Sequence, residues 1–258
     1  MERFELAMKG IMSAGAALRR SPMGEDQVSR KTDHQDLVTC RDREIEQMLR
    51  REILGSFPMD RVVGEEYPED PGSCGGVAWY IDPIDGTTNF VNQRRNYAVS
   101  IGCWKDERPL FGLVLDVERE ALYWAKAGGG AWKNGSAIHV SGRSQVSDLL
   151  LTTPCIQHTF LEEHPRRGDM LRLARAVRAV RSLGSVALEL CQLSSGEADM
   201  FVTVRSAPWD HNAARVILQE AGGCICTMEG EELPLNSKTT VAAFNSPEMS
   251  RLFMQGGY

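Results

Sequence analysis

The chain has 258 residues, of which 42% are hydrophobic and 25% charged, so it can bury a full core as one large domain or as two closely fused halves. Its 29 basic and 35 acidic residues are interleaved and give a net charge of -6, which argues against non-specific nucleic-acid binding. No apolar run approaches the roughly 18 residues that a membrane helix needs, and the start of the chain does not resemble a signal peptide. We therefore expect a cytoplasmic protein.

The first part of the chain predicts two helices. Apolar residues recur at helical spacing over residues 2–20, and a polar loop at 31–36 separates this helix from a second one. Thr39 has the character of an N-cap for the second helix, which places Asp42 in its first turn.

A β-rich stretch follows. Short runs of β-favouring residues separated by turn residues predict strands at 61–63, 77–81, 97–104, 111–117 and 122–125. The dipeptide Asn134-Gly135 is typical of a tight hairpin turn. These runs indicate antiparallel hairpins.

Beyond residue 149 helices and strands alternate. Helices are expected near 168–180, 185–195, 210–221 and 247–255, and strands near 199–204, 224–228 and 240–244. No long linker interrupts the chain, so residues 1–258 are interpreted as one domain, with an α+β half at about 1–150 and an α/β half at about 151–258. The cleft between the halves is the natural place for a site.

The most informative stretch is residues 79–90, an apolar strand that leads into two acids and then a glycine-threonine turn. Magnesium prefers oxygen ligands, so Asp82, Asp85 and the carbonyl of Ile84 form a candidate metal site. Gly86 and Thr87 could then open a helix whose free backbone N–H groups bind phosphate. Asp-Pro and Asp-Gly are also ordinary turn dipeptides, but this alternative does not explain the whole string.

Two further acids stand in comparable contexts. Glu65 follows a predicted strand, and Asp210 opens a predicted helix, although Asp210 alone has the simpler interpretation of an N-cap. Neither Ser100 nor any cysteine has a recognisable base partner, which disfavours a covalent route.

Together with further motifs, these residues make the sequence resemble the inositol monophosphatase family through nearly its whole length. The ordered matches are residues 64–66, 82–90, 98–102, 128–135, 181–185, 209–210 and 220–223. The resemblance implies an α/β (α+β) fold, the five-layered αβαβα sandwich of the inositol monophosphatase and fructose-1,6-bisphosphatase type. It also implies a homodimer.

The resemblance also assigns roles to residues. Two or three magnesium ions would be held by Glu65, Asp82, Ile84, Asp85 and Asp210. Asp42, Thr87 and Glu65 would be catalytic, the first two by orienting and activating the attacking water. The substrate would be contacted by Asp85, Gly86, Thr87, Gly184, Ser185, Val186, Thr203 and Asp210.

The predicted reaction is magnesium-dependent hydrolysis of a small phosphate monoester, first of all inositol monophosphate to inositol and phosphate. A monoester dianion repels hydroxide, so metal ions must lower the pKa of the water and neutralise the phosphoryl oxygens, and no covalent intermediate is needed. The resemblance alone implies inhibition by lithium. The alternatives are fructose 1,6-bisphosphate, histidinol phosphate or adenosine 3',5'-bisphosphate as substrate, or a non-enzymatic role as a transcription antitermination partner of RNA polymerase.

Two departures from the family pattern concern the substrate. Thr203 stands where the aligned relatives carry a glutamate that contacts an inositol hydroxyl, with Arg205 nearby, and Arg94 and Arg95 follow the phosphate turn. Arginine forks suit phosphate or carboxylate groups, so we expect weaker discrimination among polyol phosphates and some preference for a second anionic group. The alternative is that Arg94 and Arg95 face solvent or a second subunit.

Overall fold

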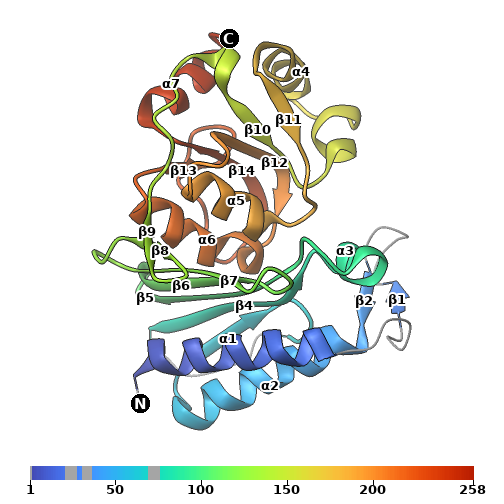
Figure 1. The fold of residues 1–258 in the computed structure, drawn as a ribbon, viewed down its shortest axis with the longest axis vertical. Helices are drawn as coiled ribbons and strands as arrows, with labels where there is room; N and C mark the ends of the chain where they lie inside the picture. Colours follow the sequence, from blue (N-terminus) through green and yellow to red (C-terminus); the bar gives the residue numbers. More distant parts are fainter. Residues whose placement is uncertain (1, 21–27, 31–36, 69–75) are drawn as a thin grey trace.

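The computed structural model describes residues 2–20, 28–30, 37–68 and 76–258, and its helices and strands form five layers (Figure 1). Helices α1 (Arg3–Arg20) and α2 (Cys40–Ser56) cover the outer face of a seven-stranded sheet. Helices α5 (Val186–Ser194) and α6 (Pro208–Glu220) lie between this sheet and a five-stranded one, beyond which lie α4 (Arg167–Ala176) and α7 (Pro247–Gln255). The αβαβα sandwich expected from the sequence is confirmed.

The first sheet has the strand order β3-β4-β5-β6-β7-β8-β9. Its strands are β3 (Arg61–Gly64), β4 (Val77–Asp85), β5 (Ala98–Lys105), β6 (Arg108–Asp116), β7 (Ala121–Lys126), β8 (Ala131–Lys133) and β9 (Ser136–Ile138). The expected antiparallel pairing holds from β4 onward, whereas β3 runs parallel to β4. Asn134 and Gly135 form the tight turn between β8 and β9, both with positive φ.

The second sheet has the order β11-β10-β12-β14-β13. Its strands are β10 (Leu150–Thr152), β11 (Ala179–Arg181), β12 (Met200–Ser206), β13 (Cys224–Cys226) and β14 (Thr239–Phe244). Strands β10, β11 and β12 run parallel, and β14 runs antiparallel to both β12 and β13. The carboxyl ends of the three parallel strands therefore meet at one edge, where ligands bind in open α/β sheets.

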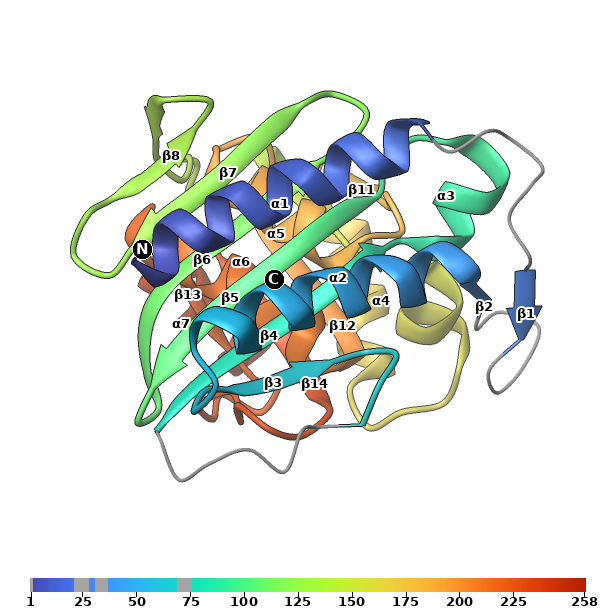
Figure 2. The same cartoon turned by 90° about the horizontal axis from the view of Figure 1, so that it is seen from below.

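Shorter elements complete the chain. Helix α3 (Thr87–Gln93) follows β4, a single 3-10 turn η1 (Val146–Asp148) precedes β10, and the π-helical turn η2 (Gln157–Leu161) follows it. The short strands β1 (Val28–Arg30) and β2 (Leu37–Thr39) pair antiparallel beyond the amino end of α2 (Figure 2). The expected polar loop at 31–36 lies outside the described residues, and none of the described helices is long and apolar enough to cross a membrane.

Three hydrophobic cores fill the spaces between the layers. One joins α1 and α2 to the first sheet, one surrounds α5 and α6 between the sheets, and one joins the second sheet to α4 and α7. Helix α6 approaches the first sheet closely because two glycines of the sheet face its backbone. A Cβ on Gly112 would lie 2.1 Å from the carbonyl oxygen of Ala213, and a Cβ on Gly102 would lie 3.0 Å from the backbone nitrogen of Ala213. This close approach brings the first turn of α6 to the sheet.

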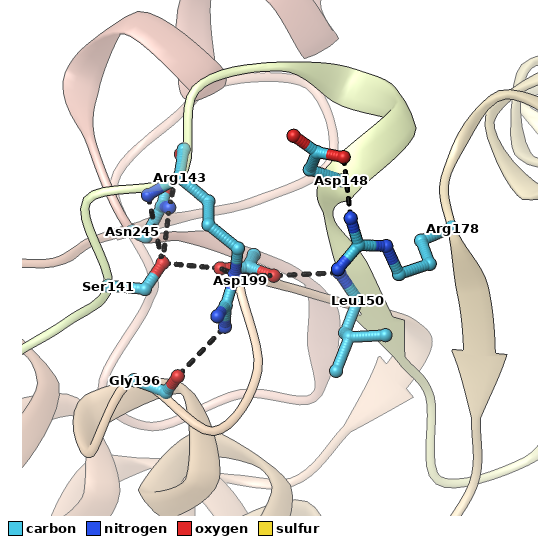
Figure 3. Close-up of polar contacts among 8 residues, drawn as sticks. All are labelled: Ser141, Arg143, Asp148, Leu150, Arg178, Gly196, Asp199 and Asn245. Atoms are coloured by element: carbon cyan, nitrogen blue, oxygen red, sulfur yellow. Dashed lines mark hydrogen bonds and ion pairs between the residues drawn. The ribbon is translucent and has the colours of Figure 1, made fainter.

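A buried aspartate fastens the connection between the two sheets (Figure 3). Asp199, at the start of β12, accepts hydrogen bonds from Ser141, from Nε of Arg143 at 2.8 Å and from the backbone of Leu150 at 2.7 Å. Asn245 donates to Ser141 Oγ at 2.9 Å and to the carbonyl of Arg143 at 2.8 Å. The segment that crosses from β9 to β10 is thus held on the second sheet.

Candidate active site

The end of β4 carries the two acids of the Asp-Pro-Ile-Asp string. The strand extends through Asp85, beyond the expected end at residue 81, and its pairing with β5 shifts register between Asp82 and Asp85. Such a bulge accommodates Pro83, which has no N–H for the ladder. Asp82 is buried and accepts a hydrogen bond from the backbone of Ile84 at 2.9 Å.

Asp85 lies against the amino end of α5, one hundred residues further along the chain. Its carboxylate accepts hydrogen bonds from Ser185 Oγ at 2.5 Å, from the backbone of Ala187 at 2.7 Å and from that of Val186 at 3.3 Å. The amino end of a helix favours an anion, so α5 stabilises this carboxylate. Gly184, with φ of 80°, completes the turn into α5. The segment predicted to line the polyol side therefore contacts a predicted metal ligand; its contact with substrate stays a prediction.

Asp42 and Thr87, predicted to act together on water, lie in contact. Thr87 Oγ1 lies 3.3 Å from Asp42 Oδ1 and 3.1 Å from the carbonyl oxygen of Ile84. The other oxygen of Asp42 accepts from the backbone and side chain of Thr39 in a capping box at the start of α2. Gly86 has φ of 94°, and a Cβ there would lie 3.1 Å from two backbone carbonyls. Gly86 is the N-cap of α3, so it leads directly into Thr87 and into the helix that is predicted to bind phosphate.

Glu65 follows β3 and is positioned by a buried glutamate of α2. Glu46 accepts hydrogen bonds from the backbone of Glu66 at 2.7 Å and of Tyr67 at 3.2 Å, and from Nε of Arg50 at 2.8 Å. A Cβ on Gly64 would lie 2.3 Å from Glu46 Oε1, so a larger residue there would displace this carboxylate. The Gly-Glu-Glu string is thus the turn that wraps around a buried carboxylate.

Asp210 lies in the first turn of α6. Its carboxylate accepts from the backbone of Ala207 at 2.7 Å and from Ser206 Oγ at 3.3 Å. The simpler interpretation of Asp210 as the N-cap residue is wrong, because Ala207 holds that position and Asp210 bonds its backbone N–H from the third residue of the helix. Its neighbour His211 is fully buried, with Nδ1 2.9 Å from Ser206 Oγ. Burial and then the charge of Arg215 lower the pKa of His211 to about 3, so it is a neutral core residue.

The electrostatics show that these acids converge. Burial raises the pKa of Asp82 well above its usual value, and the charges of Glu65, Asp85, Asp210 and Asp42 raise it further. Burial likewise raises the pKa of Asp210, and the charges of Asp85 and Glu65 add to this effect. For Asp85 burial outweighs the hydrogen bonds and raises the pKa to about 6. Asp82 therefore lies within electrostatic range of the other four predicted acidic residues.

This donor set fits a hard divalent cation, which prefers carboxylate oxygens and removes the mutual repulsion that raises these pKa values. Within the described ranges no three His, Cys, Asp or Glu side chains are already gathered as closely as ligands of one ion. Asp82, Asp85 and Asp210 instead each turn an oxygen to a backbone N–H. The carboxylates lie close enough to repel one another but farther apart than ligands around a shared ion.

The residues that depart from the family pattern lie in two places. Thr203 is buried in β12, where its hydroxyl donates to the carbonyl of Arg205 at 3.0 Å, and the exposed side chain of Arg205 contacts His158. Arg94 ends α3 with its guanidinium 3.9 Å from the Phe90 ring centre, and Arg95 is exposed and bonds Gln93.

Sequence reasoning missed two buried glutamates that support the site. Glu46 carries the Glu65 turn, and Glu189 of α5 accepts from the backbone N–H groups of Leu183 at 2.6 Å and Gly184 at 3.2 Å. Burial raises the pKa of Glu189 to about 8 despite these hydrogen bonds. Glu46 lies on the buried side of α2, and Glu189 lies in α5, which is buried on nearly all sides.

An αβαβα sandwich with acids at the facing edges of its sheets defines a class of metal-assisted phosphatases. The model of the inositol monophosphatase family matches residues 2–255, and the chain belongs to this family.

Individual relatives agree over nearly full length. The chain is 38% identical to inositol-1-monophosphatase of Bacillus subtilis, over 93% of this chain and 91% of that one. It is 32% identical to the fructose-1,6-bisphosphatase/inositol-1-monophosphatase of Thermotoga maritima, with coverage of 93% and 91%. Among solved structures, the extragenic suppressor protein suhB of Bartonella henselae superposes with a TM-score of 0.88 at 26% identity, over 98% and 97% of the two chains.

Proposed function

We propose that this protein is a magnesium-dependent phosphomonoesterase that hydrolyses inositol monophosphate to inositol and phosphate through a metal-activated water. The observation that carries the proposal is the convergence of five acidic residues from four separate elements, together with the contact between Asp42 and Thr87. The family match and the 38% identity to an inositol-1-monophosphatase support the substrate class. A comparison of different phosphate esters tests which alcohol is the leaving group.

Magnesium is the proposed cofactor, as two or three ions. Members of this family depend on magnesium, and a protein of the same fold has been solved with Mg2+ and phosphate. The proposed ligands are Glu65, Asp82, Asp85, Asp210 and the carbonyl of Ile84. When bound, such ions lower the pKa of water and neutralise the phosphoryl oxygens.

The protein's own groups supply orientation. Asp42, held by Thr39, accepts from Thr87, so the pair is pre-arranged to direct a water toward phosphorus. The backbone N–H groups of Gly86 and Thr87 are proposed to hold phosphoryl oxygens. The polyol side is assigned to Asp85, Gly184, Ser185, Val186, Thr203 and Asp210. Glu65 is proposed as both ligand and catalytic residue.

A phosphate-release screen with magnesium tests the proposal. The panel contains inositol 1-phosphate, glycerol 2-phosphate, fructose 1,6-bisphosphate, histidinol phosphate and adenosine 3',5'-bisphosphate. We expect release from inositol 1-phosphate among the fastest. No release from any ester, with co-purification of RNA polymerase, would favour the non-enzymatic antitermination role instead.

A second substrate class is favoured by one finding, the relative in Thermotoga maritima that carries both bisphosphatase and monophosphatase names. The proposal also includes inhibition by lithium, a homodimer and a cytoplasmic location, which rest on the family resemblance and on the composition. A lithium titration at limiting magnesium and light scattering of the purified protein test the first two.

A further inference from the structure

We propose that Arg205, held in place by His158, is a specificity-determining residue that binds a second phosphate group of the substrate. The inference rests on the proposed function, because it assigns part of the substrate to a residue beside the same site. We expect Arg205 to favour phosphomonoesters that carry another phosphate over those that carry only hydroxyl groups.

The position of Arg205 comes from the sheet topology. Strands β10, β11 and β12 run parallel, so the segments that follow them share one edge of the second sheet. The segment after β11 contains Ser185, which binds Asp85, and the end of β12 contains Ser206, which contacts Asp210. Arg205 directly precedes Ser206 and therefore lies at the edge that faces the clustered acids.

The backbone around Arg205 is irregular in a way that redirects its side chain. The pairing of β12 with β14 shifts register between Thr203 and Ser206, and bulges of this kind re-aim side chains next to active sites. The buried hydroxyl of Thr203 fastens the bulge by donating to the carbonyl of Arg205 at 3.0 Å. Thr203 thus adds no charge of its own, but its hydrogen bond fixes the backbone that carries the Arg205 guanidinium.

The contact with His158 fixes the orientation of the guanidinium. Arginine can only donate, so His158 Nε2, which faces Arg205 Nη2, must be the unprotonated acceptor of a neutral imidazole. His158 Nδ1 then carries the proton and donates to Glu162 Oε1 at 2.6 Å. The imidazole is itself buried in η2, and its contact with Arg205 orients the guanidinium.

The positive charge of Arg205 is not compensated by a direct ion pair. Arg143, Arg166 and Arg178 each pair with an aspartate, whereas no acidic side chain in the described part of the chain lies within ion-pair distance of Arg205. Glu162, on the far side of the imidazole, is the nearest acid in this chain of contacts and is more than half exposed. An exposed, pre-oriented guanidinium without an acid partner suits a phosphate, to which it can donate two parallel hydrogen bonds.

Fructose 1,6-bisphosphate and fructose 1-phosphate test the inference, because the two esters differ only in the second phosphate. Phosphate release is measured with magnesium for the wild type, for Arg205→Ala and for Arg178→Ala, which removes an exposed arginine near the opposite ends of the parallel strands. We expect the ratio of kcat/KM for the bisphosphate over the monophosphate to fall about tenfold or more in Arg205→Ala, the effect of one charge-assisted contact, and to change less than twofold in Arg178→Ala.

An unchanged ratio in Arg205→Ala, or a wild type that does not prefer the bisphosphate, would overturn the inference while leaving the proposed function intact. No magnesium-dependent release by the wild type from any ester would contradict the proposed function itself. His158→Phe tests the positioning role: we expect a three- to fivefold fall of the same ratio through a higher KM for the bisphosphate. His158→Gln, whose amide keeps an acceptor, should restore it. A loss of kcat that is equal for both esters in His158→Phe would contradict that role.

Discussion

The carboxylate of Asp85 lies between the start of α5, which hydrogen-bonds it, and the proposed metal site. Its carboxylate accepts three hydrogen bonds from the start of α5, yet burial still raises its pKa to about 6. A bound cation would favour the ionised form and offset that cost. The residue thus couples the position of the second half of the chain to the proposed metal site.

Asp85→Asn removes one anionic ligand while keeping the size of the side chain. We expect kcat/KM for inositol 1-phosphate to fall by about a hundredfold or more, because metal-held charge at the phosphoryl group is lost. Asp60→Asn is the control: Asp60 is buried before β3 and contacts Arg3 and Trp79. Normal turnover by Asp85→Asn would contradict the metal assignment.

Thr87→Ala tests the water-orienting pair. The change removes the hydroxyl that contacts Asp42 and Ile84 but leaves the backbone N–H that is proposed to hold phosphate. We expect kcat to fall about tenfold or more and KM to change less than threefold, because alignment matters most in the transition state. Thr87→Ser should recover most of the rate. A raised KM with normal kcat would make Thr87 a binding residue only.

At the scale of elements, helix α5 carries Glu189, whose carboxylate accepts hydrogen bonds from the Leu183–Gly184 turn. The pKa of Glu189 is raised by burial from 4.5 to about 8, so between these pH values folded chains hold a proton that unfolded chains release. The stabilising contribution is present below the unfolded pKa and is lost as pH rises through the folded one.

Glu189→Gln should therefore flatten the pH dependence of stability. In EDTA, the free energy of unfolding of the wild type, relative to Glu189→Gln, should fall by about 1 to 3 kcal/mol between pH 5 and pH 8.5. Urea unfolding at the two pH values measures the difference. Parallel pH profiles for the two proteins would show that Glu189 ionises normally.

Elements with a long, regular pattern could be predicted from the sequence, and short ones that depend on pairing could not. The helix around 40–56 follows its apolar periodicity, and the helix around 186–194 and the long strands β5 and β6 coincide with long apolar runs. Strands β10 and β11 have three residues each, too few to show alternation, so the helix expected to reach residue 180 ends at Ala176. Pairing with β10, and not local preference, makes residues 179–181 a strand.

The candidate site divides in the same way. Asp82, Asp85 and Thr87 could be identified because their string combines a strand end, two acids and a glycine turn. Glu46 and Glu189 could not, since a single acid on a helix gives no sign that it faces inward until the partner backbone is placed. Thr87 contacts Asp42 and Asp85 contacts Ser185, whereas the missed glutamates hold the turns beside them.

At the scale of the whole molecule, we propose that the two halves, about 1–150 and 151–258, form one cooperative unit. Helix α6 belongs to the second half but packs on the glycines of β5 and β6 in the first. Gly112→Ala should lower the free energy of unfolding by about 2 to 4 kcal/mol, because the methyl group meets backbone that must shift. Gly142→Ala, with nothing within 4 Å of the added carbon, is the matched control.

We expect one urea unfolding transition that moves as a whole to lower urea in Gly112→Ala, because the two halves would unfold together. Separate transitions, with only one of them displaced, would show that the halves unfold independently.

We propose that the clustered acids at the facing sheet edges hold magnesium for phosphate ester hydrolysis. The most direct test is phosphate release from inositol 1-phosphate by metal-stripped protein as magnesium is added back. We expect no release in EDTA and a saturable return of activity with magnesium, which Asp82→Asn and Asp85→Asn should both abolish. Release that continues at the same rate in EDTA would contradict it.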